Sequence, residues 1–312
     1  MTSTVLAEDV VPRRPLASTM WFGSGRSRGR TVAKLPGGGW RRAEQGPAGP
    51  LVLEVRPAND RIVLQVWGSA ATPPGAVERA LEDARAWAGF CDDLTGFAEL
   101  VAPHPLLRHA LKVVGAPILG ALPRASESFG RAVLGQLVQG LEAARSAHQL
   151  VAMLGSSTPQ QVSAWPTRES LGAAPAHQLR RCGIALRSAT ALHAFAVHEA
   201  TFERQAAGRA WHEMDASLTS IRGVGGWTSA ETRLWLGDAD AVSVGDYHIP
   251  ATIGWALGDR SEDDATMLEL LAPYAGHRGR VIRLVERAAG RGLVETKPRR
   301  GPRQALSAHR YW

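Results

Sequence analysis

The stretch Leu218–Pro250 reads L-T-S-I-R-G-V-G-G-W-T-S-A-E-T-R-L-W-L-G-D-A-D-A-V-S-V-G-D-Y-H-I-P, and its pattern predicts a helix, a tight turn and a second helix. Gly223 and Gly225 supply the backbone freedom that a sharp hairpin needs. The first N–H groups of the second helix have no partner within that helix and carry partial positive charge, which suits a phosphate. Asp246 follows nineteen residues after Trp227. Taken alone, the glycine pattern fits an ordinary helix connection equally well.

The composition is that of a globular protein with a polyanionic partner. The chain has 312 residues, 45% of them hydrophobic, so it can bury a large core and we expect two domains. The net charge of +7 favours a polyanion as partner. Cys91 and Cys182 lie far apart and outside any metal-ligand spacing, which indicates a reducing compartment. No apolar run has membrane length and residues 1–30 lack a signal-peptide core, so we expect a cytoplasmic protein without membrane contact.

An α+β fold class is predicted, with strands early in the chain and helices afterwards. Met1–Arg14 reads as a loose arm, and Thr31–Leu35 as a β-prone segment. Leu51–Arg56 and Ile62–Trp67 alternate apolar and polar residues, as strands with one buried face do. Val77–Phe90 has the pattern of an amphipathic helix. We therefore predict a small antiparallel β-sheet domain with a helix, followed by an all-α domain.

The expected domain boundaries follow the Pro and Gly breaks. Residues 1–115 form the sheet domain with its connector, 116–295 the helical domain and 296–312 a basic tail. In the first domain Arg26, Arg28 and Arg30 are candidates for DNA contact, with a solvated basic loop as the favoured alternative. The run Lys297–Arg303 in the tail is typical of a solvated segment that adds nonspecific phosphate contacts.

The stretch quoted first resembles the helix–hairpin–helix DNA glycosylases, and within them the 3-methyladenine (AlkA-like) branch. That family's hairpin has the form L-x-x-I/F-P-G-V/I-G-x-W-T-A, with a catalytic aspartate further on, usually before tyrosine. Arg222 replaces the usual proline, and Ser229 the usual alanine. The matching residues are Leu218, Ile221, Gly223, Val224, Gly225, Trp227, Thr228, Asp246 and Tyr247.

A second segment strengthens the resemblance. Arg131–Val138 reads R-A-V-L-G-Q-L-V and is similar to the family's R-A-I-L-G-Q-L/Q-V, in which the residue after the glutamine enters the duplex as a wedge. The matching residue is Leu137. Its alternative is a core leucine, because Leu137 and Leu141 continue the helical spacing of apolar residues that begins at Phe129.

The resemblance implies a site without cofactor or side-chain metal ligands. Asp246 is the expected catalytic residue. The backbone carbonyls of Thr219, Ile221 and Val224 form a candidate cation site in the hairpin. The expected base pocket consists of Trp227, Tyr247, Glu231 and Tyr274, and the expected DNA contacts are Gly223, Val224, Gly225, Gly226, Thr228, Gln136 and Leu137.

The implied function is that of a monofunctional glycosylase. It flips out alkylated purines such as 3-methyladenine or 7-methylguanine from double-stranded DNA and excises them by hydrolysis, as a nucleoid-associated monomer. No lysine lies from Thr219 to Pro250, which argues against a Schiff-base lyase route. Two alternatives stay open: a catalytically silent protein that binds DNA structure, and a glycosylase for oxidised or deaminated bases.

Glu231 has two interpretations. It lies four residues after Trp227, so both side chains project from one helix face. In a pocket, the carboxylate attracts cationic bases and disfavours neutral ones, which narrows the range of lesions. Turned outward, it pairs with Arg233 or Arg222.

The last long helix is predicted to start with cations. In Tyr274–Val285, His277, Arg278 and Arg280 lie at the N-terminal end, where the helix dipole disfavours positive charge. Either a partner anion or solvent exposure relieves this arrangement.

Overall fold

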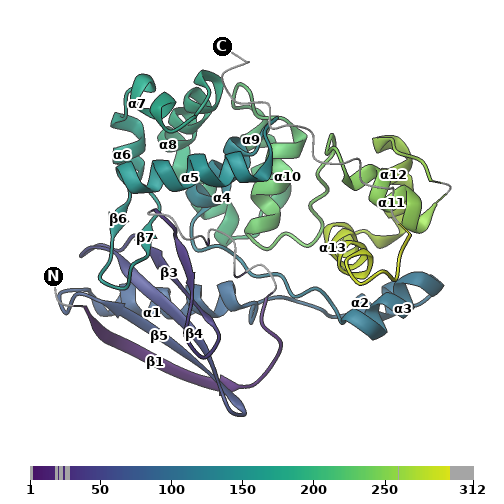
Figure 1. The fold of residues 1–312 in the computed structure, drawn as a ribbon, viewed down its shortest axis with the longest axis horizontal. Coiled ribbons are helices and arrows are strands. Elements are labelled where there is room, and N and C mark those ends of the chain that lie inside the picture. The colour runs from purple at the N-terminus through teal and green to yellow at the C-terminus, as the bar shows by residue number, and fades with distance from the viewer. Residues whose placement is uncertain (1–2, 18–19, 21–23, 25–28, 259, 296–312) are drawn as a thin grey trace.

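The computed structural model describes residues 3–17, 20, 24, 29–258 and 260–295. A sheet with one helix comes first in the chain and a larger helical part follows (Figure 1). The predicted α+β fold class is confirmed. The elements in chain order are β1 (Thr4–Pro12), β2 (Val32–Lys34), β3 (Trp40–Glu44), β4 (Leu51–Ala58), β5 (Arg61–Gly68), α1 (Pro74–Ala88), α2 (Phe97–Val101), α3 (Pro105–Val114), α4 (Ala125–Leu134), α5 (Gly140–Leu154), β6 (Ser156–Ser157), β7 (Ser163–Ala164), α6 (Arg168–Ala173), α7 (Ala176–Arg181), α8 (Leu186–Ala207), α9 (Trp211–Thr219), α10 (Gly226–Trp235), α11 (Ile249–Leu257), α12 (Asp264–Leu271), η1 (Ala272–Tyr274) and α13 (Arg278–Ala289).

The large sheet is antiparallel, with strand order β1-β5-β4-β3-β2. In β5 the side chains of Ile62, Leu64 and Val66 are buried, while those between them are partly exposed. The alternation in the sequence therefore decides which face of the strand meets the core. Helix α1 packs against β1, β4 and β5 and places Trp87 in one apolar cluster with Ile62.

The N-terminal segment is a strand and not the predicted loose arm. Thr4–Pro12 pairs with β5 along its length, with a register shift between Val5 and Ala7. The sequence misled because β1 is an edge strand, held by backbone hydrogen bonds more than by a buried apolar face. Strand β3 was also missed, since W-R-R-A-E has no apolar alternation.

The helical part is arranged around α4, every residue of which is buried. Helices α5, α8 and α10 contact it, and Phe129 stacks on Phe195 of α8 with 4.3 Å between ring centroids. Helices α2, α3, α11, α12 and α13 share a second apolar core and form a separate lobe in Figure 1. The segment 1–115 thus contributes both to the sheet and to this lobe.

Buried charges tie the sheet to α4. Arg42 of β3 and Arg131 of α4 both form ion pairs with Glu127 of α4, and the hydroxyl of Thr31 donates to Glu127 Oε1 at 2.7 Å. Burial alone would raise the pKa of Glu127, but the two arginines and the hydrogen bonds outweigh it, so the pKa is lowered. The sheet thereby fixes the helix whose C-terminal end leads into Gln136 and Leu137.

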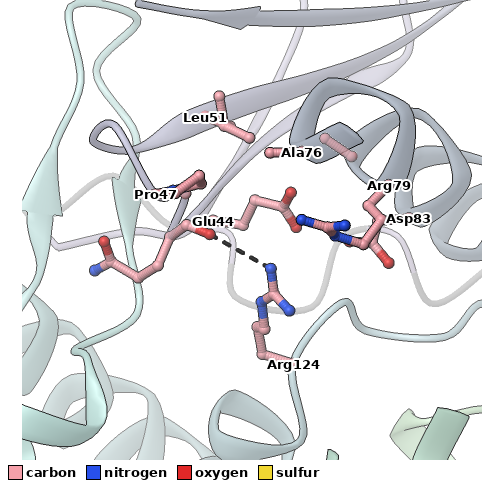
Figure 2. Close-up of a pocket in the computed structure, with 10 residues that line it drawn as sticks. Glu44, Pro47, Leu51, Ala76, Arg79, Asp83 and Arg124 are labelled. Carbon is pink, nitrogen blue, oxygen red and sulfur yellow. Dashed lines mark hydrogen bonds between the residues drawn. The ribbon is translucent and has the colours of Figure 1, made fainter. Parts of the chain in front are cut away.

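A second charged cluster occupies the same junction. Figure 2 shows Glu44 and Asp83 facing Arg79 and Arg124 around a cavity of about 30 Å³, which is the room that one water molecule takes. Burial raises the pKa of Glu44 to about 8 and that of Asp83 to about 6. Glu44 Oε2 is buried without a hydrogen-bond partner among the residues described.

The arginines at the start of α13 are neutralised inside the protein. Arg278 forms an ion pair with Asp240, and Arg280 donates to Asp92 with N–O distances of 2.6 and 2.7 Å. Neither of the two predicted explanations, a partner anion or solvent exposure, applies to Arg280, which is almost fully buried. The carboxylates come from distant segments, so the local sequence did not reveal them.

Several basic residues of the sequence analysis fall outside the described part of the chain. They are Arg26, Arg28 and the tail run Lys297–Arg303. Arg30 is described, and its Nε donates to the carbonyl of Gln161 at 2.9 Å. Of the helices in the described ranges, none combines the length and apolarity that crossing a bilayer requires.

Candidate active site

The predicted hairpin is present between α9 and α10. Helix α9 ends at Thr219, the N–H of Val224 donates to the carbonyl of Ile221 at 3.0 Å, and Gly223 adopts a φ of 88°. A side chain at position 223 would be strained at that φ. The space beside Gly223, Gly225 and Gly226 is open. The N–H groups of the first turn of α10 lack partners within the helix, so this face can receive a phosphate oxygen.

The Asp246 carboxylate lies between Trp227 of α10 and the start of α11, where three N–H groups donate hydrogen bonds to it. The indole Nε1 of Trp227 donates to Oδ2 at 2.9 Å. The backbone N–H groups of His248 and Ile249, at the start of α11, donate to Oδ1 at 2.7 and 3.0 Å. A carboxylate offers about four lone-pair sites. Asp246 therefore has a fixed orientation and can still accept a hydrogen bond, for example from a water molecule.

The segment that follows α4 lies against the hairpin. Gln136 Nε2 donates to the carbonyl of Gly223 at 3.0 Å and to Thr228 Oγ1 at 2.6 Å. The next residue, Leu137, has a φ of 56° and a side chain that is 79% exposed. A leucine in this conformation, pointing into solvent, is an uncommon arrangement. The core interpretation of Leu137 is thus not what the structure shows.

Gly135 brings this segment close to Trp227. A Cβ atom at position 135 would lie 3.3 Å from the Trp227 ring, which is tighter than an ordinary contact. The glycine therefore lets the indole settle against the end of α4, where its Nε1 reaches Asp246. Gln136, Trp227 and Asp246 form one connected arrangement.

Glu231 is a partly buried carboxylate beside this arrangement. Its side chain is 17% exposed, Ser243 Oγ donates to Oε1 at 2.5 Å, and a guanidinium nitrogen of Arg283 lies 3.8 Å from Oε1. Burial raises the pKa of Glu231, and the negative charge of Asp246 adds to the rise, while Arg283 and Ser243 oppose it. Glu231 does not use either of the arginines considered from the sequence.

The two tyrosines of the expected pocket have different surroundings. Tyr247 is 75% exposed, with its ring edge-on to His248 at 4.8 Å between centroids. Tyr274 is only 8% exposed and belongs to the apolar core that also contains Ile249 and Ile253. Of the two tyrosines, Tyr247 is therefore the one with an open aromatic face next to Asp246.

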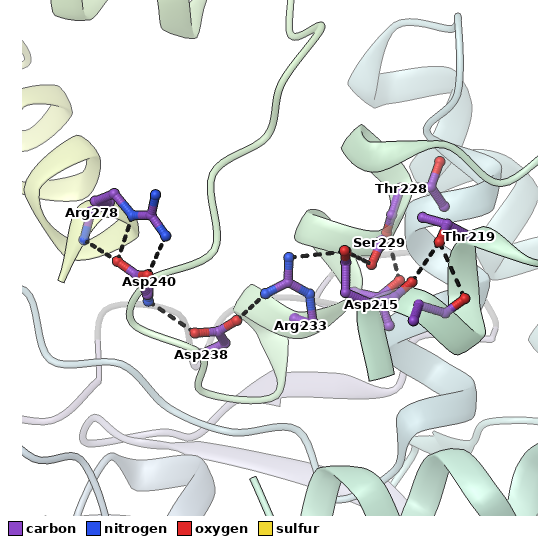
Figure 3. A network of polar contacts seen from close by, with 10 residues as sticks. Asp215, Thr219, Thr228, Ser229, Arg233, Asp238, Asp240 and Arg278 are labelled. Atoms are coloured by element: carbon purple, nitrogen blue, oxygen red, sulfur yellow. Dashed lines mark hydrogen bonds and ion pairs between the residues drawn. The ribbon is translucent and has the colours of Figure 1, made fainter. Parts of the chain in front are cut away.

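A chain of polar contacts links α9 and α10 to each other and to the segment that follows α10 (Figure 3). Asp215 of α9 accepts from Ser229 Oγ at 2.6 Å and pairs with Arg233 of α10. Arg233 also pairs with Asp238, whose Oδ1 accepts from the N–H of Asp240 at 2.9 Å. Because Asp240 in turn binds Arg278 of α13, this chain connects the hairpin to the second lobe.

Comparisons with known proteins find similarity in structure only. No protein-family model and no curated protein matches the sequence. Among solved structures, the 3-methyladenine DNA glycosylase of Archaeoglobus fulgidus has a TM-score of 0.73 at 16% identity, over 90% of this chain and 98% of that one. The 8-oxoguanine glycosylase/lyase of Clostridium acetobutylicum, in complex with double-stranded DNA, has a TM-score of 0.64 at 13% identity, over 94% and 99%. The chain has the helix–hairpin–helix DNA glycosylase fold.

A third neighbour covers about two thirds of this chain. The 3-methyladenine DNA glycosylase of Schizosaccharomyces pombe, in complex with abasic DNA, has a TM-score of 0.51 at 19% identity, over 64% of this chain and 97% of that one. The neighbours are named for two different lesions. The fold is therefore common to glycosylases of different specificity, and the lesion must be argued from the site.

The residues that the sequence analysis expected to contact DNA form two groups, one exposed and one lying beneath the surface. Gly223, Gly225, Gly226 and Leu137 are exposed. Val224 and Thr228 are buried, and the Gln136 amide is bonded to the hairpin, so these three shape the surface from beneath it. In the candidate cation site, the carbonyl of Ile221 accepts the N–H of Val224. The groups of acidic, histidine and cysteine side chains in the described ranges hold no set suited to a metal ion.

Three contributors to the site were not predicted. Ser243 and Arg283 bind Glu231, and Gly135 makes room for Trp227. Arg283 comes from α13, so only the folded chain brings it near α10. Gly135 lies within the quoted R-A-V-L-G-Q-L-V segment, where its position directly before Gln136 is the signal that the sequence offered.

Proposed function

We propose that the protein is a monofunctional DNA glycosylase that hydrolyses the N-glycosidic bond of alkylated purines in double-stranded DNA. The observation that carries this proposal is the position of Asp246. Its carboxylate is fixed by Trp227 and by the start of α11, and it lies beside an open glycine hairpin. The exposed Leu137 is held at the same edge through Gln136.

The chemistry asks little of the protein beyond a fixed negative charge. As the bond between the base nitrogen and C1′ breaks, positive charge develops on the sugar, and a carboxylate near C1′ stabilises it. The base departs with the bonding electron pair, water bonds to C1′, and the water proton passes to Asp246 or to solvent. One unit charge at about 4 Å with an effective dielectric constant near 20 contributes ~4 kcal/mol, about three orders of magnitude in rate.

Stabilisation of this size is sufficient when the base is cationic before it leaves. An N-alkylated purine leaves as a neutral base, so its bond to the sugar is already weakened. The flipped base needs aromatic faces, which Trp227 and the exposed Tyr247 supply, and a cationic ring gains ~0.5–2 kcal/mol over an indole. Tyr274 is placed in the core and is better understood as a support for α11 than as a stacking partner.

The reaction type follows from what the hairpin lacks. No lysine lies between Thr219 and Pro250, so no amine is available there to form a Schiff base with C1′. Borohydride should therefore trap no covalent adduct between the protein and lesion-containing DNA. A trapped adduct would contradict the monofunctional proposal.

Asp246→Asn is the direct test of the site. The amide keeps the shape of the side chain but removes the charge, so release of 7-methylguanine should fall about a thousandfold, while binding to a duplex with an abasic-site analogue persists. Asp60→Asn, in an exposed turn of the sheet, is the control and should release base at the wild-type rate. Near-normal release by Asp246→Asn would overturn the assignment.

Two other functions are separated by the same substrates. A silent DNA-binding protein would bind the abasic analogue and release no base from any lesion. A glycosylase for oxidised or deaminated bases would release 8-oxoguanine or hypoxanthine faster than 7-methylguanine. The fixed carboxylate of Asp246 favours a catalytic protein over one that only binds DNA, and the partly buried carboxylate of Glu231 favours cationic over neutral bases.

A further inference from the structure

Two leucines stand out on the surface beside the hairpin. Leu137 is 79% exposed and Leu141 is 82% exposed, and no other large apolar side chain in the described ranges is as exposed as these two. Exposed leucines scattered singly need no explanation. This pair, however, is separated by only three residues and lies where the protein is proposed to meet DNA.

Leu141 is exposed although the sequence pattern places it on an apolar helix face. It lies seven and ten residues before His148 and Val151 of α5, both of which are buried on the same side of that helix. Burial along α5 increases from the exposed Gly140 and Leu141 to the buried Ala147. The first turn of α5 therefore projects beyond the core.

The position of Leu137, the proposed wedge, limits where the first turn of α5 can lie. Gln136 is bonded to the hairpin, Leu137 follows it, and four residues of chain can span at most about 14 Å between the Cα atoms of Leu137 and Leu141. Helices α5 and α10 both pack on α4. Gln136 contacts the hairpin, and Leu137 and Leu141 follow it in the chain, so Leu141 lies within that reach of the wedge.

We propose that Leu141 is a second insertion residue, which contacts the base that remains in the duplex opposite the flipped nucleotide. This inference rests on the proposed function. The minor groove is only about 6 Å wide, so a wedge at the flipped nucleotide brings the neighbouring side chain against the opposite strand. The net charge of +7 favours a polyanionic duplex as the partner, to which Leu137 and Leu141 would add apolar contacts.

The proposal has a consequence for specificity. Base edges are distinguished by hydrogen-bond donors and acceptors, and a leucine side chain has neither. Leu137 and Leu141 would therefore support the distorted duplex without selecting the base opposite the lesion. The protein should bind an abasic-site analogue with the same affinity, within about twofold, whichever of the four bases lies opposite.

The experiment compares Leu141→Ser with a matched exposed leucine. Leu186, the first residue of α8, is 57% exposed and supplies the control Leu186→Ser. The full-length proteins are titrated onto a duplex that carries a tetrahydrofuran abasic analogue opposite 2-aminopurine, whose fluorescence reports stacking. We expect Leu141→Ser to bind about five- to tenfold more weakly, the loss expected when a leucine is no longer partly buried, and to lose the fluorescence change. Leu186→Ser should match wild type in both.

The outcomes separate this inference from the proposed function. If the wild-type protein neither binds the abasic duplex nor releases base, the proposed function fails. If it does both and Leu137→Ala is impaired while Leu141→Ser equals wild type, the role of Leu141 alone is overturned. A concentration-dependent dimer that Leu141→Ser dissociates, with DNA binding unchanged, would also overturn it, because Leu141 would then contact a second copy of the chain. Since Leu141 is exposed, equal melting temperatures should show that the variants are folded.

Discussion

At the scale of single residues, Glu231 adds a second carboxylate to the electrostatic surroundings of Asp246. Ser243 and Arg283 hold it in place, and burial raises its pKa. The spacing of four residues indicated a face shared with Trp227, and the structure shows both side chains interacting with the Asp246 segment, Trp227 through Asp246 and Glu231 through Ser243. Arg233, one of the partners considered from the sequence, is instead bound to Asp215 and Asp238.

Replacing Glu231 by glutamine tests its role in selecting the base. Glu231→Gln removes the negative charge that the side chain can carry and keeps its size, so kcat/KM for 7-methylguanine should fall about tenfold, which corresponds to ~1.4 kcal/mol. Release of neutral hypoxanthine should change less. The two lesions are measured in the same duplex sequence, with the exposed Glu78 on α1 replaced likewise as control. Equal losses on both lesions would assign Glu231 a structural role.

Residues of the site that lie in one stretch were predictable, and their partners were not. The pattern around Trp227 and Asp246 predicted a hairpin and a following aspartate, and the structure brings these two residues together. The bond from Trp227 Nε1 to Asp246, and the contact of Gly135 with the indole, depend on how α4 meets α10. Such contacts arise from tertiary packing, which no local pattern encodes.

At the scale of elements, the end of α4 decides the shape of the edge that is proposed to face DNA. The apolar spacing predicted a helix that continues through Leu137, whereas α4 ends at Leu134 and α5 begins at Gly140. Leu137 lies in the connection between these helices, where it has a positive φ and an exposed side chain. Periodicity cannot distinguish a buried leucine from one presented at a break, so the wedge could be inferred only from the resemblance.

Gln136 is expected to couple this break to the hairpin. Gln136→Ala removes both of its hydrogen bonds and leaves the buried Thr228 hydroxyl without this donor, at a cost of ~1–2 kcal/mol in the free energy of unfolding. Base release should fall further than stability implies, because Leu137 loses its fixed position. Gln149→Ala, on an exposed part of α5, serves as the control. In a double-mutant cycle with Thr228→Val, the two changes should be non-additive, and simple additivity would show that the elements are not coupled.

At the scale of the whole molecule, the junction between the sheet and the helices contains carboxylic acids whose pKa values are raised by burial. Glu44 and Asp83 surround the small cavity of Figure 2, and burial also raises the pKa of Glu203, near the start of α4, to about 7. Arg124 lies among these three acids, and Arg42 also acts on Glu44. The sequence predicted a sheet domain and a helical domain but not this junction, because β3 has no apolar alternation and its charges become buried only when α4 packs on it.

The junction should make the protein less stable as pH rises. The pKa of Glu44 is about 8 in the folded protein against 4.5 for an ordinary glutamate, so between these values the folded state binds more protons than the unfolded state. The free energy of unfolding therefore falls as pH increases through this window. Glu44→Gln resembles the protonated acid, so it should equal wild type in urea unfolding at about pH 4, below the unfolded-state pKa. Near pH 8.5 it should be more stable than wild type by roughly 1–3 kcal/mol. This is less than 1.36 kcal/mol per pKa unit would give, because Asp83 and Arg124 readjust. Glu78→Gln, exposed on α1, should leave the pH profile unchanged. Parallel profiles for Glu44→Gln and wild type would mean that Glu44 is already ionised in the folded protein.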